Sequence, residues 1–375
     1  MSNNNHPIYV TSPGLPPFEE YVDEIRSLWE TGILTHQGPK YRALEKELEK
    51  YLGIPYVPLF ANGHLALQVL LRAQGWDKGE VITTPFTFGS TTMAIAECGL
   101  KPVFCDVRRD TFTIDTDKIE SLITPQTKAI LPVHVYGMPC DVDRIDEIAQ
   151  RYGLKVFYDA AHAFGETLDG RALSDYGDAS MFSFHATKVF NTVEGGALCL
   201  HDEKTNDVAC KIRQFGAHGD GAPVHYIGTN AKMTEIHAAM GLCNMRHLDE
   251  YIEKRRAVFE TYHDLLSGAK GLELLHYPKG LKPNYAYYPV VFEDEFGASR
   301  DKVAEKLEGI NVFARKYFFP GTNHFEVIEE KYGAQSAPVS DDLSRRVLCL
   351  PLHPNMTPED AERIARCVVS AGELR

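Results

Sequence analysis

The sequence predicts an α/β fold, in which a large domain with a mostly parallel sheet precedes a smaller α+β domain at the C-terminal end. Two patterns support this prediction. Up to about residue 200, short apolar runs alternate with segments of helical period. A long amphipathic segment follows, and beyond it the pattern becomes a mixture of helices and strands. A chain of 375 residues has the length of about two domains, which we expect at residues 1–245 and 246–375.

The expected strands of the large domain are the short apolar runs. They span residues 56–60, 80–84, 102–107, 128–135, 155–158, 180–184 and 196–200. Helices fit between most of them, as the crossovers of a parallel sheet require. The segment from about residue 233 to 266 exceeds the usual length of a globular helix and predicts the connector between the domains. In the smaller domain we expect strands at residues 272–276, 285–292 and 312–317.

The composition is that of an ordinary globular enzyme, with 44% hydrophobic and 24% charged residues. The net charge of −13 argues against nucleic acid or an anionic membrane as the main partner. No apolar stretch approaches membrane-spanning length. The first ten residues lack the basic flank and apolar core of a signal peptide, so we expect a cytoplasmic protein.

Common catalytic and metal-binding motifs are missing from the sequence. It contains no HExxH, GxSxG, GxxxxGK or GxGxxG, so metal hydrolases, serine esterases, P-loop enzymes and dinucleotide dehydrogenases lose their usual support. We expect no metal site. The eight cysteines form no CxxC pair and mostly lie in apolar runs, which indicates buried thiols in a reducing compartment.

The strongest chemical signal lies in residues 183–188, which read Ser-Phe-His-Ala-Thr-Lys and end at Lys188. Upstream, the apolar run 155–158 predicts a buried strand, and Asp159 and His162 follow directly after it. Ligands of open α/β sheets bind at the carboxyl ends of the strands. The two segments therefore predict one site at that edge of the sheet.

Pyridoxal phosphate makes three demands that this site can meet. It needs a lysine amine for a Schiff base, a carboxylate to keep its ring nitrogen protonated, and donors for its phosphate. Lys188, Asp159 and Ser183 supply these groups in that order. Taken singly, each residue also has a structural interpretation, because Asp159 can cap a helix and Ser183 and His162 can be hydrogen-bonded core groups.

Matching stretches spread over nearly the whole chain resemble the DegT/DnrJ/EryC1/StrS family, the sugar aminotransferases of fold type I among pyridoxal phosphate enzymes. These stretches are Gly38-Pro39, Asn62-Gly63, and residues 84–88, 104–107, 133–137, 159–162, 183–188, 194–196 and 230–235. The resemblance implies that Lys188 carries the cofactor and then moves a proton between substrate and cofactor carbons. Pyridoxamine phosphate would be the intermediate between the two half-reactions.

The resemblance also assigns the other cofactor contacts. Asp159 would pair with the ring nitrogen, and His162 stands where the family often has Gln facing the phenolic oxygen. Phe88 resembles the aromatic residue that stacks on the ring, although alone it would be core packing. Gly63 and the amide of His64 would hold the phosphate at a helix N-terminus. The family commonly has Thr at the His64 position, which puts the usual hydroxyl contact in question.

Asn230 resembles the residue that reaches the phosphate of a neighbouring subunit, although alone it fits a helix cap or turn. The resemblance therefore implies a homodimer with shared active sites. The implied substrates are a nucleotide-linked keto sugar and L-glutamate. Candidates for binding the sugar nucleotide are Arg315, Lys316, Tyr317, His134, Tyr136 and His185. The segment 315–320 can also be the exposed end of a strand.

Within the family, the chain looks most like transaminases that act on carbon 4 of dTDP-4-keto-6-deoxyglucose. Amination of carbon 3 of a dTDP-3-keto-6-deoxyhexose is the alternative, because both reactions use the same cofactor chemistry. Related dehydratases carry His in place of the lysine, so Lys188 weighs against dehydration. A non-catalytic regulator on the same fold would need a DNA-reading module, for which no basic patch is evident.

Overall fold

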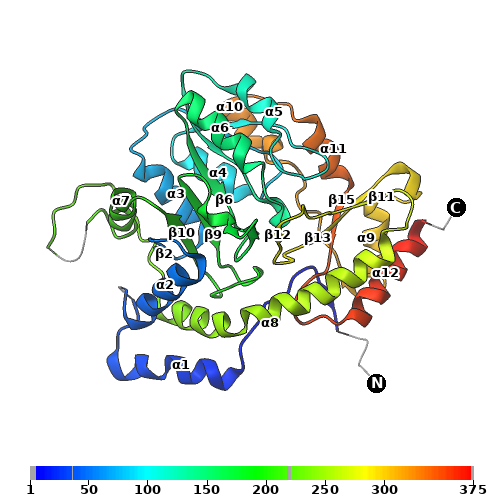
Figure 1. Cartoon of the computed structure of the whole chain (residues 1–375), viewed down its shortest axis with the longest axis horizontal. Coiled ribbons are helices and arrows are strands. Elements are labelled where there is room, and N and C mark those ends of the chain that lie inside the picture. Colours follow the sequence, from blue (N-terminus) through cyan, green and yellow to red (C-terminus); the bar gives the residue numbers. More distant parts are fainter. Residues whose placement is uncertain (1–5, 36, 218–220, 373–375) are drawn as a thin grey trace.

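The computed structural model describes residues 6–35, 37–217 and 221–372 and confirms the predicted α/β fold (Figure 1). Its central sheet has seven strands in the order β2-β10-β9-β6-β5-β3-β4. β10 is antiparallel to both neighbours, whereas the other pairs are parallel. The strands are β2 (Leu59–Phe60), β3 (Glu80–Thr83), β4 (Lys101–Phe104), β5 (Thr127–Leu131), β6 (Lys155–Asp159), β9 (Ala179–Ser183) and β10 (Gly196–Leu200).

The predicted strand positions are confirmed, but some predicted strands are too long. The run 128–135 ends as a strand at Leu131, because Pro132 has no N–H for the ladder. The chain then turns at Val135–Gly137, where Tyr136 adopts a φ of 59°. Of the run 56–60, Leu59–Phe60 forms β2, while Tyr56 makes an isolated bridge to Leu200.

Helices cover both faces of the sheet, because alternate residues of each strand point to opposite sides. Val81 joins the hydrophobic cluster beneath α3 and α7, whereas Ile82 joins the cluster beneath α6. One face carries α3 (Gly63–Ala73), α4 (Gly89–Glu97) and α7 (Glu203–Arg213). The other carries α2 (Pro39–Leu52), α6 (Val142–Tyr152) and the first part of α8 (Glu235–Leu266). Short α5 (Thr116–Ile119) lies beside α6, and α1 (Phe18–Thr31) packs on α8.

The predicted connector is α8, which runs from beneath the large sheet to the C-terminal elements (Figure 1). It is 32 residues long, yet neither it nor any other helix within the described ranges is long and apolar enough to cross a membrane. Its second half packs with α12 (Pro358–Gly372), and α9 (Arg300–Glu308) lies against α12. An antiparallel sheet completes this layer with β11 (Leu272–Leu274), β13 (Tyr288–Phe292) and β15 (Val347–Leu350).

The predicted strand 312–317 is shorter than expected. β14 covers Val312–Phe313 and pairs with β1 (Ile8–Tyr9), after which Arg315 forms one bridge to Cys349. The following segment leaves the small sheet and contacts the large one, since the amide of Thr322 donates to the carbonyl of Pro85 at 2.9 Å.

Elements from both predicted domains are interleaved. α10 (Glu326–Tyr332) and α11 (Pro338–Arg346) follow the small-domain strand β14 in the chain but lie on the side of the large domain (Figure 1), where the hydroxyl of Tyr332 donates to the carbonyl of Leu100 at 2.9 Å, just before β4. The carboxylate of Asp106 accepts the amide of Ser340 at 2.9 Å, at the start of α11. A small sheet also joins β12 (Leu281–Lys282) to β7 (Thr167–Leu168) and β8 (Arg171–Ala172). A domain boundary at residue 245 therefore stays a prediction.

Candidate active site

The candidate site lies where β6 and β9 end side by side. Asp159, the last residue of β6, pairs in register with Met181 of β9. β9 ends at Ser183, and the loop that follows carries Lys188. The parallel sheet therefore brings together the two segments that the sequence predicted to form one site.

Asp159 is 5% exposed and held by two donors. The hydroxyl of Thr91 donates to Oδ2 at 2.6 Å, and the amide of Ala161 donates to Oδ1 at 3.1 Å. Burial raises the pKa of Asp159, while these two hydrogen bonds and the charge of Lys188 oppose the increase. Among the described residues no cation contacts this carboxylate, so a protonated ring nitrogen would supply the missing charge.

His162 has a defined tautomer. Its Nδ1 accepts the backbone N–H of Tyr136 at 3.0 Å, so the proton of the neutral ring resides on Nε2. Burial, with a smaller contribution from the charge of Lys188, lowers the pKa of His162 well below its ordinary value. The ring is therefore a neutral donor through Nε2, the form needed to face a phenolate oxygen.

Lys188 lies beside two aromatic residues. Its Nζ is 5.9 Å from the ring centroid of Tyr287, and that ring is 4.6 Å from the ring of His162. Burial lowers the pKa of Lys188 to about 8, although Asp159 and Tyr317 favour its charged form. An amine with such a pKa is roughly one-tenth unprotonated at pH 7, a far larger fraction than for an ordinary lysine, and can act as a nucleophile.

Ser183, Gly63 and Gly196 meet at the N-terminus of α3. A Cβ on Gly63 would lie 3.0 Å from the Cβ of Ser183, and one on Gly196 would lie 2.5 Å from the nitrogen of Gly63. The three segments therefore touch only because these positions are glycine. Asn62 caps α3 by accepting the amide of Leu65 at 2.8 Å. The first amides of α3 have no acceptor within the helix and form an anion site beside Ser183.

The side chain of His64 turns away from this anion site. Its Nδ1 lies 2.9 Å from Ser90 Oγ, and its Nε2 lies 3.1 Å from Glu97 Oε2. His64 is thus available to a phosphate through its backbone amide, as expected.

Phe88 precedes α4 and is 64% exposed, so its ring is free to cover a flat ligand and the core-packing interpretation is wrong.

Asn230 is exposed, and Lys232 donates to its Oδ1 at 2.6 Å. It does not cap α8, because Thr234 is the N-cap and accepts the amide of His237 at 3.4 Å. The helix-cap interpretation of Asn230 is therefore wrong. Its carboxamide faces solvent, where a second subunit can reach it.

The segment 315–320 borders the site beside Lys188. Tyr317 lies 5.8 Å from Tyr287, measured between ring centroids, and its carbonyl accepts the hydroxyl of Tyr136. Arg315 is exposed, with its guanidinium 5.9 Å from the ring of Tyr317. Lys316 instead forms an ion pair with Asp301 at 2.7 Å. Arg315 is consequently the freer of the two predicted cations.

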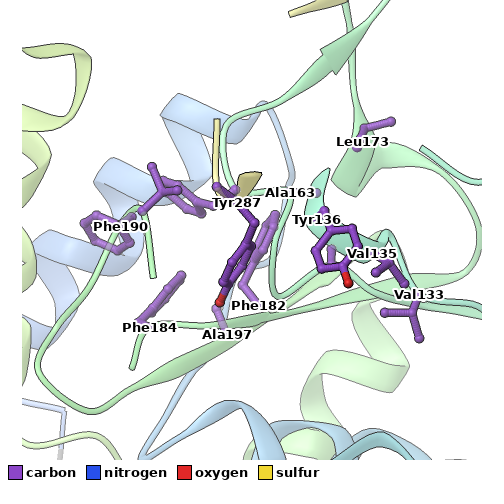
Figure 2. Packing of buried hydrophobic residues seen from close by; sticks show 14 of the residues in the cluster. Val133, Val135, Tyr136, Ala163, Leu173, Phe182, Phe184, Phe190, Ala197 and Tyr287 are labelled. Carbon is purple, nitrogen blue, oxygen red and sulfur yellow. The ribbon is translucent and has the colours of Figure 1, made fainter. Parts of the chain in front are cut away.

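Two candidates for sugar binding lie inside the protein. His134 is fully buried, stacks on Tyr158 at 4.6 Å and accepts the amide of Cys140 through Nδ1 at 3.1 Å. The prediction that His134 contacts substrate is therefore corrected: His134 is a core residue. Tyr136 is also fully buried, within the aromatic cluster around Tyr287 (Figure 2), and acts on the site through its amide and hydroxyl. His185 is exposed, and its Nδ1 lies 2.8 Å from Thr187 Oγ1.

The sequence did not predict Thr91 and Tyr287 as site residues. Thr91 lies three residues after Phe88 on the same helical face, so its spacing was a usable signal. Tyr287 lies in an apolar run about 100 residues beyond Lys188, and nothing local marks it.

The observed groups fit pyridoxal phosphate: a nucleophilic amine, a carboxylate lacking a cation, a neutral imidazole donor, an anion site and an exposed ring.

Known proteins agree with this geometry. The model of the DegT/DnrJ/EryC1/StrS aminotransferase family matches residues 18–369. The chain is 40% identical to a dTDP-4-amino-4,6-dideoxy-D-glucose transaminase of Shigella dysenteriae, over 96% of this chain and 98% of that protein. It is 37% identical to one of Escherichia coli, over 98% and 99%. The crystal structure of DesI in the presence of its TDP-sugar product superimposes with a TM-score of 0.92 at 32% identity, covering 99% of this chain and 94% of that one. The chain therefore belongs to the DegT/DnrJ/EryC1/StrS aminotransferase family, whose cofactor is pyridoxal phosphate.

Proposed function

We propose that this protein transfers the amino group of L-glutamate to carbon 4 of dTDP-4-keto-6-deoxyglucose. The observation that carries the proposal is the grouping of Lys188, Asp159 and His162 at one edge of the sheet. The names of the two transaminases that resemble the chain over nearly its full length support the substrate and the carbon.

In this proposal the cofactor's phosphate binds at Ser183 and the amides of Gly63 and His64. Asp159 holds the ring nitrogen, and the Nε2 proton of His162 faces the phenolic oxygen. Phe88 covers the ring. Bound pyridoxal phosphate supplies an electrophilic carbon and an electron sink for the bond broken at the amino donor.

Lys188 then performs two tasks. Its amine first attaches the cofactor, and a pKa near 8 keeps a useful fraction of it unprotonated for that step. As a free amine beside the bound cofactor, Lys188 would also accept a proton from the amino donor and return it during the transfer.

The sugar nucleotide is proposed to bind across the segment 315–320. Arg315 carries a positive charge without a described ion-pair partner, which suits a diphosphate. Tyr317 can pack on an apolar sugar face, and His185 lies exposed in the loop that carries Lys188. Lys316 contributes less because Asp301 neutralises it.

We also propose a homodimer with shared active sites. Phe215 is 58% exposed and Ile227 is 88% exposed, and both lie near Asn230 in a segment joined by the hydrogen bond from the amide of Phe215 to the carbonyl of Thr229. Exposed apolar side chains grouped in this way are typical of subunit interfaces. Asn230 would then reach the partner's phosphate site.

All eight cysteines are free thiols, which is consistent with the cytoplasm as the proposed location.

Product analysis tests the proposal. The holoenzyme is incubated with dTDP-4-keto-6-deoxyglucose and L-glutamate, and the product is examined by mass spectrometry and NMR. We expect an amine on carbon 4 and release of 2-oxoglutarate. An amine formed only from a 3-keto isomer, on carbon 3, would contradict the proposed position. Failure to aminate either keto sugar would contradict the proposed function.

A further inference from the structure

A buried asparagine joins two segments of the active site that are distant in sequence. Asn284 is 1% exposed, and its Nδ2 donates to the carbonyls of His162 at 2.9 Å and Phe164 at 3.0 Å. Three residues later in the chain is Tyr287, whose ring contacts His162 and lies beside Lys188. The side chain of Asn284 therefore ties the loop that carries His162 to the segment that carries Tyr287.

Glu166 holds Asn284 from the other side. It is 1% exposed, and its Oε1 accepts the backbone N–H of Asn284 at 3.0 Å. The same oxygen lies against Gly137, where an added Cβ would be only 2.5 Å away. Gly137 follows Tyr136, whose amide fixes the tautomer of His162. Glu166 thus joins its own loop, 162–166, to two other segments: the turn at 135–137 and residues 284–287.

The surroundings of Glu166 favour an uncharged carboxyl. Burial raises the pKa of Glu166 well above its ordinary value, and the amide of Asn284 only partly opposes this. Tyr277 is an ionisable neighbour, and burial is the main cause that raises its pKa well above the ordinary value; an ionised Glu166 would raise it further. Within the described ranges, Glu166 Oε2, Asn284 Oδ1 and Tyr277 Oη have no hydrogen-bond partner. A neutral carboxyl tolerates such surroundings far better than a carboxylate does.

The packing leaves these groups little freedom. The cavity bounded by His162, Lys188, Asn284 and Tyr287 has a volume of only about 10 Å³, close to the smallest that can hold one water molecule. A shift of Asn284 would therefore be transmitted to the residues beside Lys188 instead of being absorbed by free space.

We propose that Glu166 and Asn284 are positioning residues, which hold His162 and Tyr287 in place against Lys188. Neither residue needs to touch substrate or cofactor, because each acts through backbone groups of the site. The proposal rests on the proposed function, since it assumes that Lys188 and His162 face the bound cofactor.

The test compares E166Q, E166A and N284A as holoenzymes, with E80A as the control for loss of a buried glutamate elsewhere, at the first residue of β3. Three quantities are measured: kcat, KM for the sugar nucleotide, and the pH midpoint of the bound cofactor's visible absorbance. The optical midpoint needs no sugar substrate, so it stays informative even if the proposed substrate is wrong. Failure of the wild-type protein to bind the cofactor would refute the proposed function itself.

Gln can replace a neutral carboxyl and still accept the amide of Asn284, so E166Q should keep the wild-type midpoint and kcat. E166A and N284A should lower kcat by roughly 100-fold with little change in KM, and both should shift the midpoint. E80A should leave the midpoint unchanged. The proposal is overturned if E166A and N284A keep the wild-type midpoint and kcat, or if E166Q behaves like E166A. If E166A fails to fold, the comparison of N284A with E166Q decides the matter.

Discussion

The buried and exposed parts of the site are built differently. The inner wall consists of the buried Asp159 and His162 and the half-buried Lys188, and hydrogen bonds fix the carboxylate of Asp159 and the ring of His162. The rim, made of Phe88, Arg315 and Asn230, is exposed. The inner wall therefore has its protonation states set before a substrate arrives, whereas the rim can adapt to what binds. We therefore propose that the wall performs the chemistry, while Arg315 of the rim contacts the substrate.

The largest expected effect is at Lys188. K188A should lower turnover by about 10⁴-fold or more, because it removes both the nucleophile and the proton carrier. K188R is the sharper comparison, since it keeps a cation that cannot deprotonate, and it should be equally inactive. Steady-state rates of both purified variants check this. Near wild-type turnover by K188R would contradict a role for the free amine.

Asp159 should rank next. D159N keeps the shape of the side chain but removes the negative charge that would stabilise a protonated ring nitrogen, so kcat should fall by roughly 100- to 1,000-fold. T91V removes one hydrogen bond to the same carboxylate and should cost about tenfold. Equal losses in the two variants, measured as kcat, would mean that the charge of Asp159 does not matter.

The pKa of Lys188 predicts a pH dependence. Burial disfavours the charged amine, so its unprotonated fraction should rise with pH around a midpoint near 8. At pH 8 this gives roughly 150 times more free amine than an unperturbed lysine has. The rate of pyridoxal phosphate uptake by the apoenzyme should level off above the midpoint. The same reaction of a simple alkylamine serves as the control. An uptake rate that still rises above pH 10 would contradict the lowered pKa.

At the rim, Arg315 and Lys316 give a matched pair. R315A should raise KM for the sugar nucleotide about tenfold, with kcat nearly unchanged, because a charge-assisted contact to phosphate is lost. K316A should change KM by less than about twofold, since Lys316 is already paired with Asp301 at the surface. A larger rise in KM for K316A than for R315A would indicate that Lys316, and not Arg315, binds the diphosphate.

The smallest effect is expected at His64. Its ring contacts Ser90 and Glu97, so H64A should change the affinity for pyridoxal phosphate by less than about threefold. S183A removes a hydroxyl donor to a charged group and should weaken binding about tenfold. Cofactor titrations of the two apoenzyme variants check this. A larger loss in H64A would show that the imidazole takes part in phosphate binding.

Local sequence patterns were sufficient to predict the order of the strands along the chain and the long helix α8. Apolar runs locate buried strands, and the strand-end position of Asp159 predicted its side of the sheet. The turn at Tyr136 was not predictable, because its φ of 59° depends on contacts with His162 and Tyr317. His134 was misassigned for a related reason. It was predicted to lie at the end of the strand 128–135, but that strand ends at Leu131, and the turn that follows buries His134.

Contacts between distant segments account for the rest of what was missed. Thr91 reaches Asp159 across 68 positions, and Asn284 reaches His162 across 122. Such pairs form only after the fold has brought the two segments together. The local spacing of apolar and polar residues therefore does not predict them. Glu166 had one local signal, an acidic residue directly after the small and apolar stretch 160–165.

The central claim is that Lys188 of the inner wall carries the cofactor. Borohydride reduction of the holoenzyme, followed by peptide mapping with mass spectrometry, tests it most directly. We predict a single reduced pyridoxyl adduct on the peptide that contains Lys188, and none after prior incubation with excess L-glutamate. An adduct on another lysine, or no adduct in a protein that has bound the cofactor, would contradict the account.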